Sequence, residues 1–215
     1  MSNPNTEQYW DEVYRREWER GVIGTEAYNR DYGPIHDAVI ELIPDGARTL
    51  DLGCGPGLLC HKIKVARPQA SVMGVDFSAY TVACNQKRDA DLGITYRCLD
   101  LRGALSALPS PFDVITICEV IEHLDEPERI VDEAVTLLRE GGLLVVTCPH
   151  DNEIPDPEHV RVWGHDELFH LLARYGETVS FRHFPPPYFH IWMMAWVTKA
   201  PDADWPRRDV DSTDQ

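Results

Sequence analysis

Three glycines alternate with other residues just after a short apolar segment, at Gly53, Gly55 and Gly57. Glycine lets a backbone turn sharply and approach a ligand closely, so this run predicts a ligand-binding loop. The dinucleotide fingerprint G-x-G-x-x-G would need glycine at position 58, which is Leu58, and a phosphate-binding lysine motif is absent. The loop therefore favours a nucleoside ligand without a pyrophosphate.

Acidic residues stand at the ends of four apolar segments, at Asp51, Asp76, Asp100 and Glu119. If these segments are parallel strands, their carboxyl ends meet at the sheet edge where ligands bind in open α/β folds. A carboxylate such as Asp76 can accept both hydroxyl groups of a ribose. The acidic rim suits a cationic ligand with a ribose and an adenine amine, and it suits a phosphate badly. Taken singly, each acid could also be a helix cap.

The segments that must position these residues alternate between two periodicities. Strands are predicted at Arg48–Leu52, Ser71–Val75, Thr95–Leu99, Phe112–Cys118 and Leu143–Thr147. Helices are predicted over Leu58–Ala66 and between Ser78 and Gly93, starting after Ser78 and stopping before Gly93. A third helix is predicted to begin at Asp125, with Glu128 in capping-box register, and to end at Gly141-Gly142. This alternation implies right-handed βαβ units and a parallel sheet.

The two ends of the chain follow other patterns. Near the start, one helix is predicted after Thr6, with Tyr9, Trp10, Val13, Tyr14 and Trp18 as an apolar stripe, and a second helix is predicted to open at Pro34. Towards the end, a helix over Asp166–Tyr175 precedes strands at Thr178–Phe184 and Ile191–Lys199. Their close spacing predicts an antiparallel pair at the sheet edge.

Composition limits the partners. The chain has 215 residues, with 20 Lys and Arg against 36 Asp and Glu, which gives a net charge of −16. Such a surface repels phosphate backbones and anionic lipid, so nucleic acid and membranes are disfavoured partners. The first nine residues lack the features of a signal peptide, and the six cysteines contain no C-x-x-C pair. We therefore expect buried, reduced thiols in a cytoplasmic protein that is a monomer or homodimer.

Five motifs in order, DLGCGPG, GVDFS, CLDL, FDVITICEVIEHL and GGLLVVTCP, resemble class I S-adenosylmethionine-dependent methyltransferases, among them the ubiquinone-pathway O-methyltransferases. The resemblance covers roughly Ala47 to Lys199. It implies a Rossmann-like, doubly wound α/β fold with a seven-stranded sheet, mostly parallel with an antiparallel edge strand, and helices on both faces. It also implies a helical lid over 1–46, a methyltransferase domain over 47–200 and, with the charged composition of the end, a disordered tail over 201–215.

The same resemblance implies how the cofactor S-adenosylmethionine is bound, with S-adenosylhomocysteine as the product. The loop from Asp51 to Gly57 would hold the methionine part, Asp76 the ribose, Phe77 and Asp100 the adenine, and Glu119 would line the methyl-transfer side. The cofactor-binding residues that it implies are Asp51, Gly53, Cys54, Gly55, Gly57, Asp76, Phe77, Ser78, Asp100, Leu101, Glu119 and Val120.

Methyl transfer from a sulfonium is an in-line displacement, in which much of the catalysis can be proximity and orientation. A base helps when the acceptor is a hydroxyl or a protonated amine. His123 and Glu122, just after the fourth strand, are the predicted catalytic residues. The alternative interpretation is that His123 caps or packs at the start of a helix.

A divalent metal is an alternative use of the same segment. Glu119, Glu122 and His123 could share one helical face and, with His159 or His150, form an oxygen-rich site suited to Mg²⁺ or Mn²⁺. This arrangement is similar to the metal sites of small-RNA 3′-terminal 2′-O-methyltransferases. We do not favour metal, because glutamates on a helix are often simply solvated.

The acceptor-binding candidates lie in predicted loops, which often carry binding groups. They are Tyr28, Tyr32, His150, His159 and Arg161. Arg161 could clamp a substrate carboxylate, or it could pair with a nearby surface acid. The sequence thus predicts methyl transfer to an oxygen or nitrogen of a small molecule. The rivals are a metal-assisted RNA 2′-O-methyltransferase and a non-catalytic, cofactor-binding regulatory module.

Overall fold

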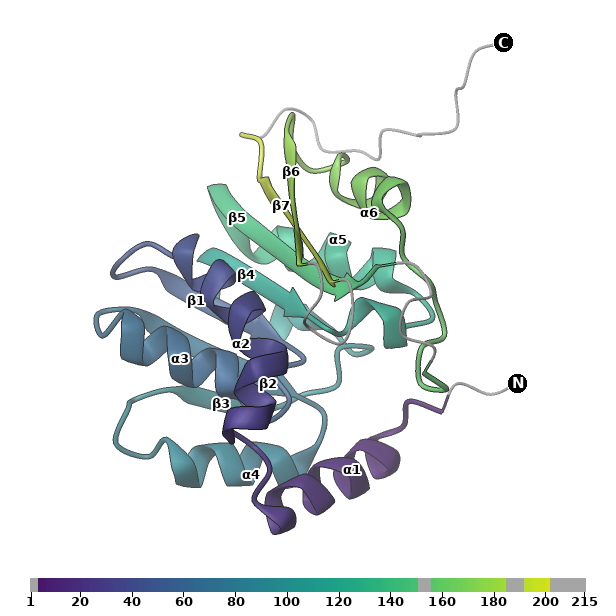
Figure 1. Ribbon diagram of the computed structural model, residues 1–215. Coiled ribbons are helices and arrows are strands. Elements are labelled where there is room, and N and C mark those ends of the chain that lie inside the picture. The colour runs from purple at the N-terminus through teal and green to yellow at the C-terminus, as the bar shows by residue number, and fades with distance from the viewer. Residues whose placement is uncertain (1–3, 151–155, 185–191, 202–215) are drawn as a thin grey trace.

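A computed structural model describes residues 4–150, 156–184 and 192–201 of the chain (Figure 1). Its centre is one seven-stranded sheet with strand order β3-β2-β1-β4-β5-β7-β6. The strands are β1 (Arg48–Leu52), β2 (Ser71–Asp76), β3 (Thr95–Cys98), β4 (Phe112–Cys118), β5 (Leu138–Pro149), β6 (Val179–Phe184) and β7 (Trp192–Thr198). The predicted α/β fold with a mixed seven-stranded sheet is confirmed.

Strands β1 to β5 pair in parallel, and β7 is antiparallel to both of its neighbours, β5 and β6. The antiparallel pair predicted for the sheet edge is therefore present. The reversed strand is β7, which lies one place in from the edge, because it pairs with β5 on one side and β6 on the other.

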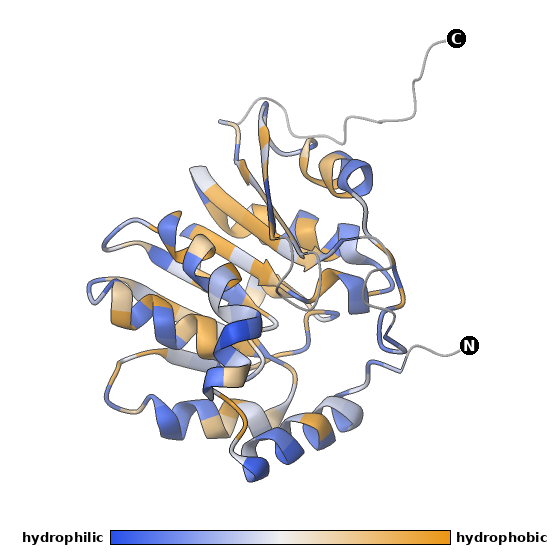
Figure 2. Ribbon diagram, viewed as in Figure 1, coloured by the Kyte–Doolittle hydropathy of each residue, from blue (hydrophilic) through white to orange (hydrophobic). Residues whose placement is uncertain are grey.

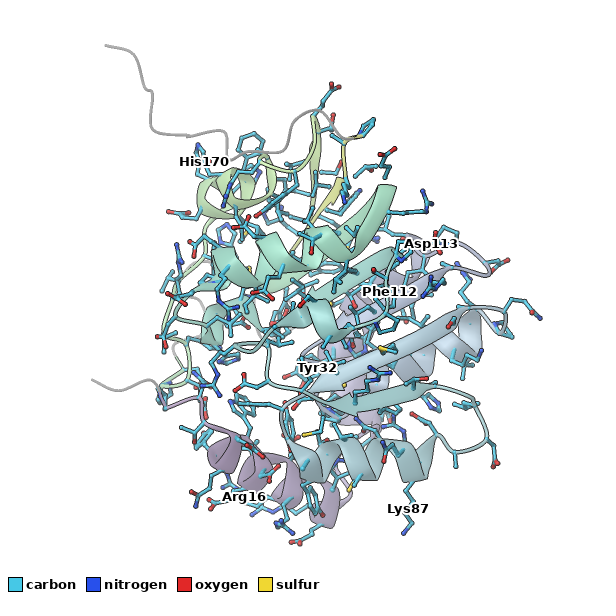
Figure 3. All side chains as sticks on the ribbon, turned by 180° about the vertical axis from the view of Figure 1, so that it is seen from behind. Arg16, Tyr32, Lys87, Phe112, Asp113 and His170 are labelled. Carbon is cyan, nitrogen blue, oxygen red and sulfur yellow. The ribbon has the colours of Figure 1, made fainter. Side chains whose placement is uncertain are left out.

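Helices cover both faces of the sheet. The helices are α1 (Glu7–Arg20), α2 (Glu26–Glu41), α3 (Leu58–Ala66), α4 (Ala79–Arg88), α5 (Pro127–Leu137) and α6 (His165–Leu172), with short 3-10 turns η1 (Leu105–Ala107) and η2 (Ile121–His123). One apolar core joins α2, α3 and α4 to one face, and a second joins α5 and α6 to the other. Figure 2 shows apolar strands at the centre and polar residues on the outer sides of the helices. In Figure 3, Arg16 on α1 and Lys87 on α4 are two such exposed side chains.

Two predicted helix starts are wrong. Helix α2 begins at Glu26, where the Thr25 hydroxyl accepts a hydrogen bond from Tyr28 N, and Pro34 lies inside it. Proline lacks the N–H that would bond to the carbonyl of Arg30, so the helix continues through Pro34 without that hydrogen bond.

Helix α5 also begins later than predicted, at Pro127, and Glu126 at its N-cap makes no side-chain capping bond. Proline suits the first helical position because its fixed φ matches the helix. The helix ends at Leu137 and not at Gly141, since Leu138 already pairs with Phe112 in the sheet.

The segment predicted as a lid over 1–46 divides into two parts. Helix α2 packs on the sheet through Ile35, Val39 and their neighbours, so it belongs to the main body of the fold. Helix α1 has no buried residue and lies against α4. The lid expectation therefore no longer includes α2, which is part of the core.

Two further expectations concern the burial of the cysteines and contact with membranes. All six cysteines are free thiols, but only Cys54, Cys60 and Cys148 are buried, and Cys98 is exposed. Within the residues described, none of the helices combines the length and apolarity needed to cross a lipid bilayer. Of the predicted tail, all but Pro201 lies outside the described residues.

Candidate active site

A cavity of about 410 Å³ opens at the carboxyl ends of the parallel strands. It brings together residues from the loops after β1, β2, β3 and β4, from the segment around α1 and from the start of α5. The predicted site residues that line it are Gly53, Asp76, Phe77, Asp100, Leu101, Glu119, Val120 and His123. Residues far apart in the sequence thus converge at the predicted edge of the sheet.

The glycine loop is held against the end of β2. Gly53 N and Cys54 N both donate hydrogen bonds to Val75 O, at 2.8 and 2.9 Å. Gly53 has a φ of +74°, and a Cβ atom there would stand 2.5 Å from Val120 Cγ2. Only glycine fits this close approach.

Asp76 ties this loop to the second strand. Its carboxylate oxygens accept hydrogen bonds from Gly55 N and Ser78 N, both at 2.9 Å. Burial raises the pKa of Asp76 to about 6, although both hydrogen bonds favour the charged form. A carboxylate has about four lone-pair sites, so Asp76 keeps acceptor capacity for hydroxyl groups in the cavity.

Asp51 supports the loop from below and does not line the cavity. Its Oδ1 accepts a hydrogen bond from Thr116 Oγ1 at 2.6 Å, and its Oδ2 accepts one from Cys60 Sγ at 3.5 Å. Burial raises the pKa of Asp51 to about 6. We therefore assign Asp51 a structural position beneath the cofactor loop.

The other predicted loop residues also lie behind the cavity surface. Tyr14 covers Gly55, because a Cβ there would stand 3.0 Å from the Tyr14 hydroxyl. Gly57 packs against Asn85, and Ser78 caps α4 by accepting a hydrogen bond from Thr81 N at 3.2 Å.

The far end of the cavity contains a cation that the sequence did not single out. Arg102 Nη2 lies 2.8 Å from Asp100 Oδ2, and the Arg102 guanidinium stands 5.6 Å from the centroid of the Phe77 ring. Burial opposes ionisation of Asp100, but the hydrogen bonds from Arg102 outweigh it and lower the pKa. Asp100 therefore meets a ligand as one half of an ion pair.

Glu119 occupies a strained position at the end of β4. Its φ of +56° is the one positive value outside glycine among the residues described. Its N–H donates to Thr147 O at 3.1 Å, and its Oε1 accepts from Thr147 Oγ1 at 2.6 Å. The other oxygen, Oε2, is buried and has no hydrogen-bond partner. Burial, and then repulsion by Glu122, raise the pKa of Glu119 well above its usual range.

Glu122 and His123 lie in the 3-10 turn η2, so the predicted helical face shared with Glu119 is wrong. The left-handed residue Glu119 and the three-residue turn break the i, i+3, i+4 geometry. Glu122 is 2% exposed, its Oε2 has no partner, and burial raises its pKa to about 8. Burial lowers the pKa of His123 to about 4, so this imidazole is neutral at pH 7.

Three side chains of this region could hold a metal ion. Glu122, His123 and His159 each offer one donor atom, and these atoms all lie within 4.8 Å of one another. Glu119 and His150 are not members of this group of described residues. One carboxylate oxygen and two imidazole nitrogens suit a divalent transition metal better than the oxygen-rich set that the sequence predicted.

The predicted acceptor-binding residues do not line the cavity. Arg161 Nη2 lies 2.7 Å from Glu128 Oε1, as the alternative interpretation expected. The rings of Tyr28 and Tyr32 lie tilted against each other at 4.8 Å, and the His150 ring contacts the His183 ring at 5.5 Å. These distances are between ring centroids.

The structure adds cavity residues that sequence reasoning missed. Asn5, Trp10 and Tyr14 line the cavity from the N-terminal segment, and Arg129 lines it from α5. Trp10 and Tyr14 belong to the aromatic stripe that periodicity favoured as packing. Asn5 stands before the predicted helix, where no periodic signal could identify it.

We compared the sequence and the fold with those of known proteins. Residues 50–146 match the family described as "Methyltransferase domain". The ubiquinone biosynthesis O-methyltransferase of Xylella fastidiosa (strain 9a5c) is 36% identical over 114 residues, which are 52% of this chain and 46% of that protein. The chain thus spans less than half the length of this relative.

Two solved structures share the fold at low sequence identity. Magnesium protoporphyrin IX methyltransferase from Synechocystis PCC 6803 with bound S-adenosylmethionine has a TM-score of 0.69 at 16% identity, over 90% of this chain and 95% of that one. The N-methyltransferase NodS from Bradyrhizobium japonicum WM9, in complex with S-adenosylhomocysteine, has a TM-score of 0.67 at 16% identity, over 90% and 99%. Residues 50–146 are thus similar to a methyltransferase domain, and the chain shares its fold with methyltransferases whose structures contain S-adenosylmethionine or S-adenosylhomocysteine.

Proposed function

We propose that this protein transfers a methyl group from S-adenosylmethionine to an oxygen or nitrogen of a small-molecule acceptor. The observation that carries the proposal is the cavity itself, where the glycine loop, Asp76 and the buried acid Glu119 surround one space. A nucleoside with a sulfonium charge complements both its hydroxyl acceptors and its negative charge. The relatives named above include an O-methyltransferase and an N-methyltransferase.

In this proposal Asp76 binds the ribose hydroxyls, and Phe77, Leu101 and the Asp100–Arg102 pair surround the adenine. Gly53 and Val120 leave room for the methionine part. His123 is the base, because its neutral imidazole lines the cavity and can take a proton from the acceptor. Glu122 lies behind it, with Oε1 at 3.9 Å from His123 Nε2.

A metal-assisted reaction is the second candidate. The observation in its favour is the group of Glu122, His123 and His159. A net charge of −16 opposes an RNA acceptor, so a bound metal would more plausibly orient oxygen atoms of a small molecule. Titration of Mn²⁺ into the protein and into His159→Ala, by calorimetry, tests the site, and turnover with and without EDTA tests its use.

The remaining expectations are parts of the same proposal. Six free thiols fit a reducing compartment such as the cytoplasm. We propose a monomer or homodimer as the oligomeric state. The proposed partner is a small-molecule acceptor and not a nucleic acid. The non-catalytic alternative predicts tight cofactor binding with no turnover for any acceptor.

Calorimetry with S-adenosylhomocysteine and with NADH tests the cofactor directly. We expect heat from the first and none from the second. Tight binding of NADH without binding of S-adenosylhomocysteine would refute the proposal. A mass-spectrometric screen for a gain of one methyl group across candidate acceptors then identifies the substrate.

A further inference from the structure

The side chain of Asn5 lies where three segments meet: the residues before α1, the turn η2 after β4, and the loop after β5. Its Nδ2 donates hydrogen bonds to His123 O at 3.3 Å and to Glu158 O at 2.7 Å. Its Oδ1 accepts a hydrogen bond from Trp10 Nε1 at 2.9 Å. Asn5 is 6% exposed, so a buried amide uses its donors and its acceptor inside the protein.

The same partners hold the imidazole of His123. His123 Nδ1 lies 3.0 Å from Glu158 O, the carbonyl to which Asn5 also donates. A carbonyl only accepts, so Nδ1 carries the proton and Nε2 keeps its lone pair. The Trp10 ring meets the His123 ring edge-on, with centroids 5.3 Å apart. Two of the groups that contact the His123 ring are therefore themselves bonded to Asn5.

We propose that Asn5 is a positioning residue, which fixes the tautomer and orientation of His123 at the cavity and couples them to the placement of α1. A hydrogen-bonded neighbour commonly sets which imidazole nitrogen is protonated. The catalytic meaning of this role rests on the proposed function, in which His123 is the base. The claim that Asn5 sets the tautomer and orientation of the His123 ring does not rest on the proposed function.

A simpler role for Asn5 would be to anchor α1. The structure separates this anchoring role from the positioning of His123. Helix α1 has other attachments, since Trp18 Nε1 donates to Thr81 Oγ1 at 3.1 Å and Asp11 bonds to Ser78. These bonds join α1 to α4 and do not reach His123. Loss of the Asn5 bonds therefore leaves α1 attached to α4, while loss of the Trp18 bond removes one link to α4 and leaves the Asn5 bonds in place.

The test compares three variants of the full chain. Asn5→Asp keeps an oxygen for Trp10 but cannot donate to the two carbonyls, Asn5→Ala removes the whole amide, and Trp18→Phe is the matched control that loses only the α4 bond. Long-range ¹H–¹⁵N spectra report the tautomer of His123, whose signals are identified by their absence in His123→Ala. Circular dichroism confirms that each variant is folded.

We expect wild type and Trp18→Phe to show a proton on Nδ1, and both Asn5 variants to show mixed tautomers. Turnover in both Asn5 variants should fall about tenfold or more, with affinity for S-adenosylhomocysteine changed less than about threefold. An unaltered His123 spectrum in both Asn5 variants would overturn the proposal. A changed spectrum with wild-type turnover would overturn its catalytic part.

Failure of the proposed function is a separate result. It would show as absence of S-adenosylhomocysteine binding by the wild-type protein. The His123 spectrum is recorded without cofactor, so it decides the positioning role in either case.

Discussion

The two sides of the cavity differ in how completely their polar groups are paired. On the adenosine side, which we define by Asp76, Phe77 and Asp100, both carboxylates have hydrogen-bond donors within the protein. On the acceptor side, which we define by Glu119, Glu122 and His123, each glutamate has a buried oxygen without a partner. Unpaired buried acceptors are costly, so they are kept where a ligand or proton supplies the missing partner.

This difference indicates two modes of recognition. On the adenosine side, backbone N–H groups and Arg102 already donate hydrogen bonds to both acids. On the acceptor side, burial makes Glu119 and Glu122 costly to ionise, and a sulfonium, a metal ion or a bound proton can relieve that cost. The predictions below challenge this contrast, beginning with the largest expected effect.

Removal of the proposed base should have the largest effect on turnover. His123→Ala should lower kcat by about 100-fold or more, the range typical of general base catalysis, with little change in cofactor affinity. Steady-state kinetics and calorimetry measure the two quantities. Wild-type turnover in the variant would remove His123 from the mechanism and leave the acceptor side without a base.

Loss of Asp76 should act on the adenosine side instead. Asp76→Ala removes the acceptor of Gly55 N and Ser78 N and the proposed ribose ligand. Loss of charged hydrogen bonds of about 2–3 kcal/mol corresponds to an affinity for S-adenosylhomocysteine about 30- to 150-fold weaker. The control is Asp51→Asn, which lies beneath the loop and should weaken binding far less. Equal affinity of wild type and Asp76→Ala would refute the ribose role.

The cost of ionising the buried Glu122 should make the stability of the protein depend on pH. Burial raises the pKa of Glu122 to about 8 from its ordinary 4.5, so the folded state binds the proton more tightly than the unfolded state. The resulting stability is fully present below pH 4.5 and is lost as pH rises through about 8.

Glu122→Gln should therefore have a higher Tm than wild type at pH 9 and a flatter profile between pH 6 and pH 9. Each kcal/mol of relieved cost corresponds to about 2–4 °C in a chain of this size. Differential scanning calorimetry at several pH values measures this, with Glu140→Gln at an exposed position as the control. Parallel profiles of Tm against pH for wild type and Glu122→Gln would show that ionisation of Glu122 costs no stability.

The smallest effect is expected outside the cavity. Arg161 pairs with Glu128 on a partly exposed surface, where an ion pair contributes less than about 1 kcal/mol. Arg161→Ala should therefore change kcat/KM less than about twofold and Tm by only a few degrees. A large rise in KM would instead extend the acceptor side to this loop.

Local patterns in the sequence were enough to predict the framework of the site. Strands β1 and β4 and helix α3 have the predicted bounds, because short apolar runs and glycine turns act over a few residues. The same local logic placed Gly53, Asp76 and Glu119 at strand ends. Parallel strands then bring such ends together whatever the intervening helices contain.

Only the tertiary structure decided which side chains complete the cavity and which are used elsewhere. Asn5 meets His123 and Glu158 across 118 and 153 residues, and no periodicity encodes such a contact. The left-handed backbone of Glu119 and the short turn η2 broke the helical face that sequence spacing predicted. Spacing along a chain determines which face a residue occupies only after the backbone conformation is known.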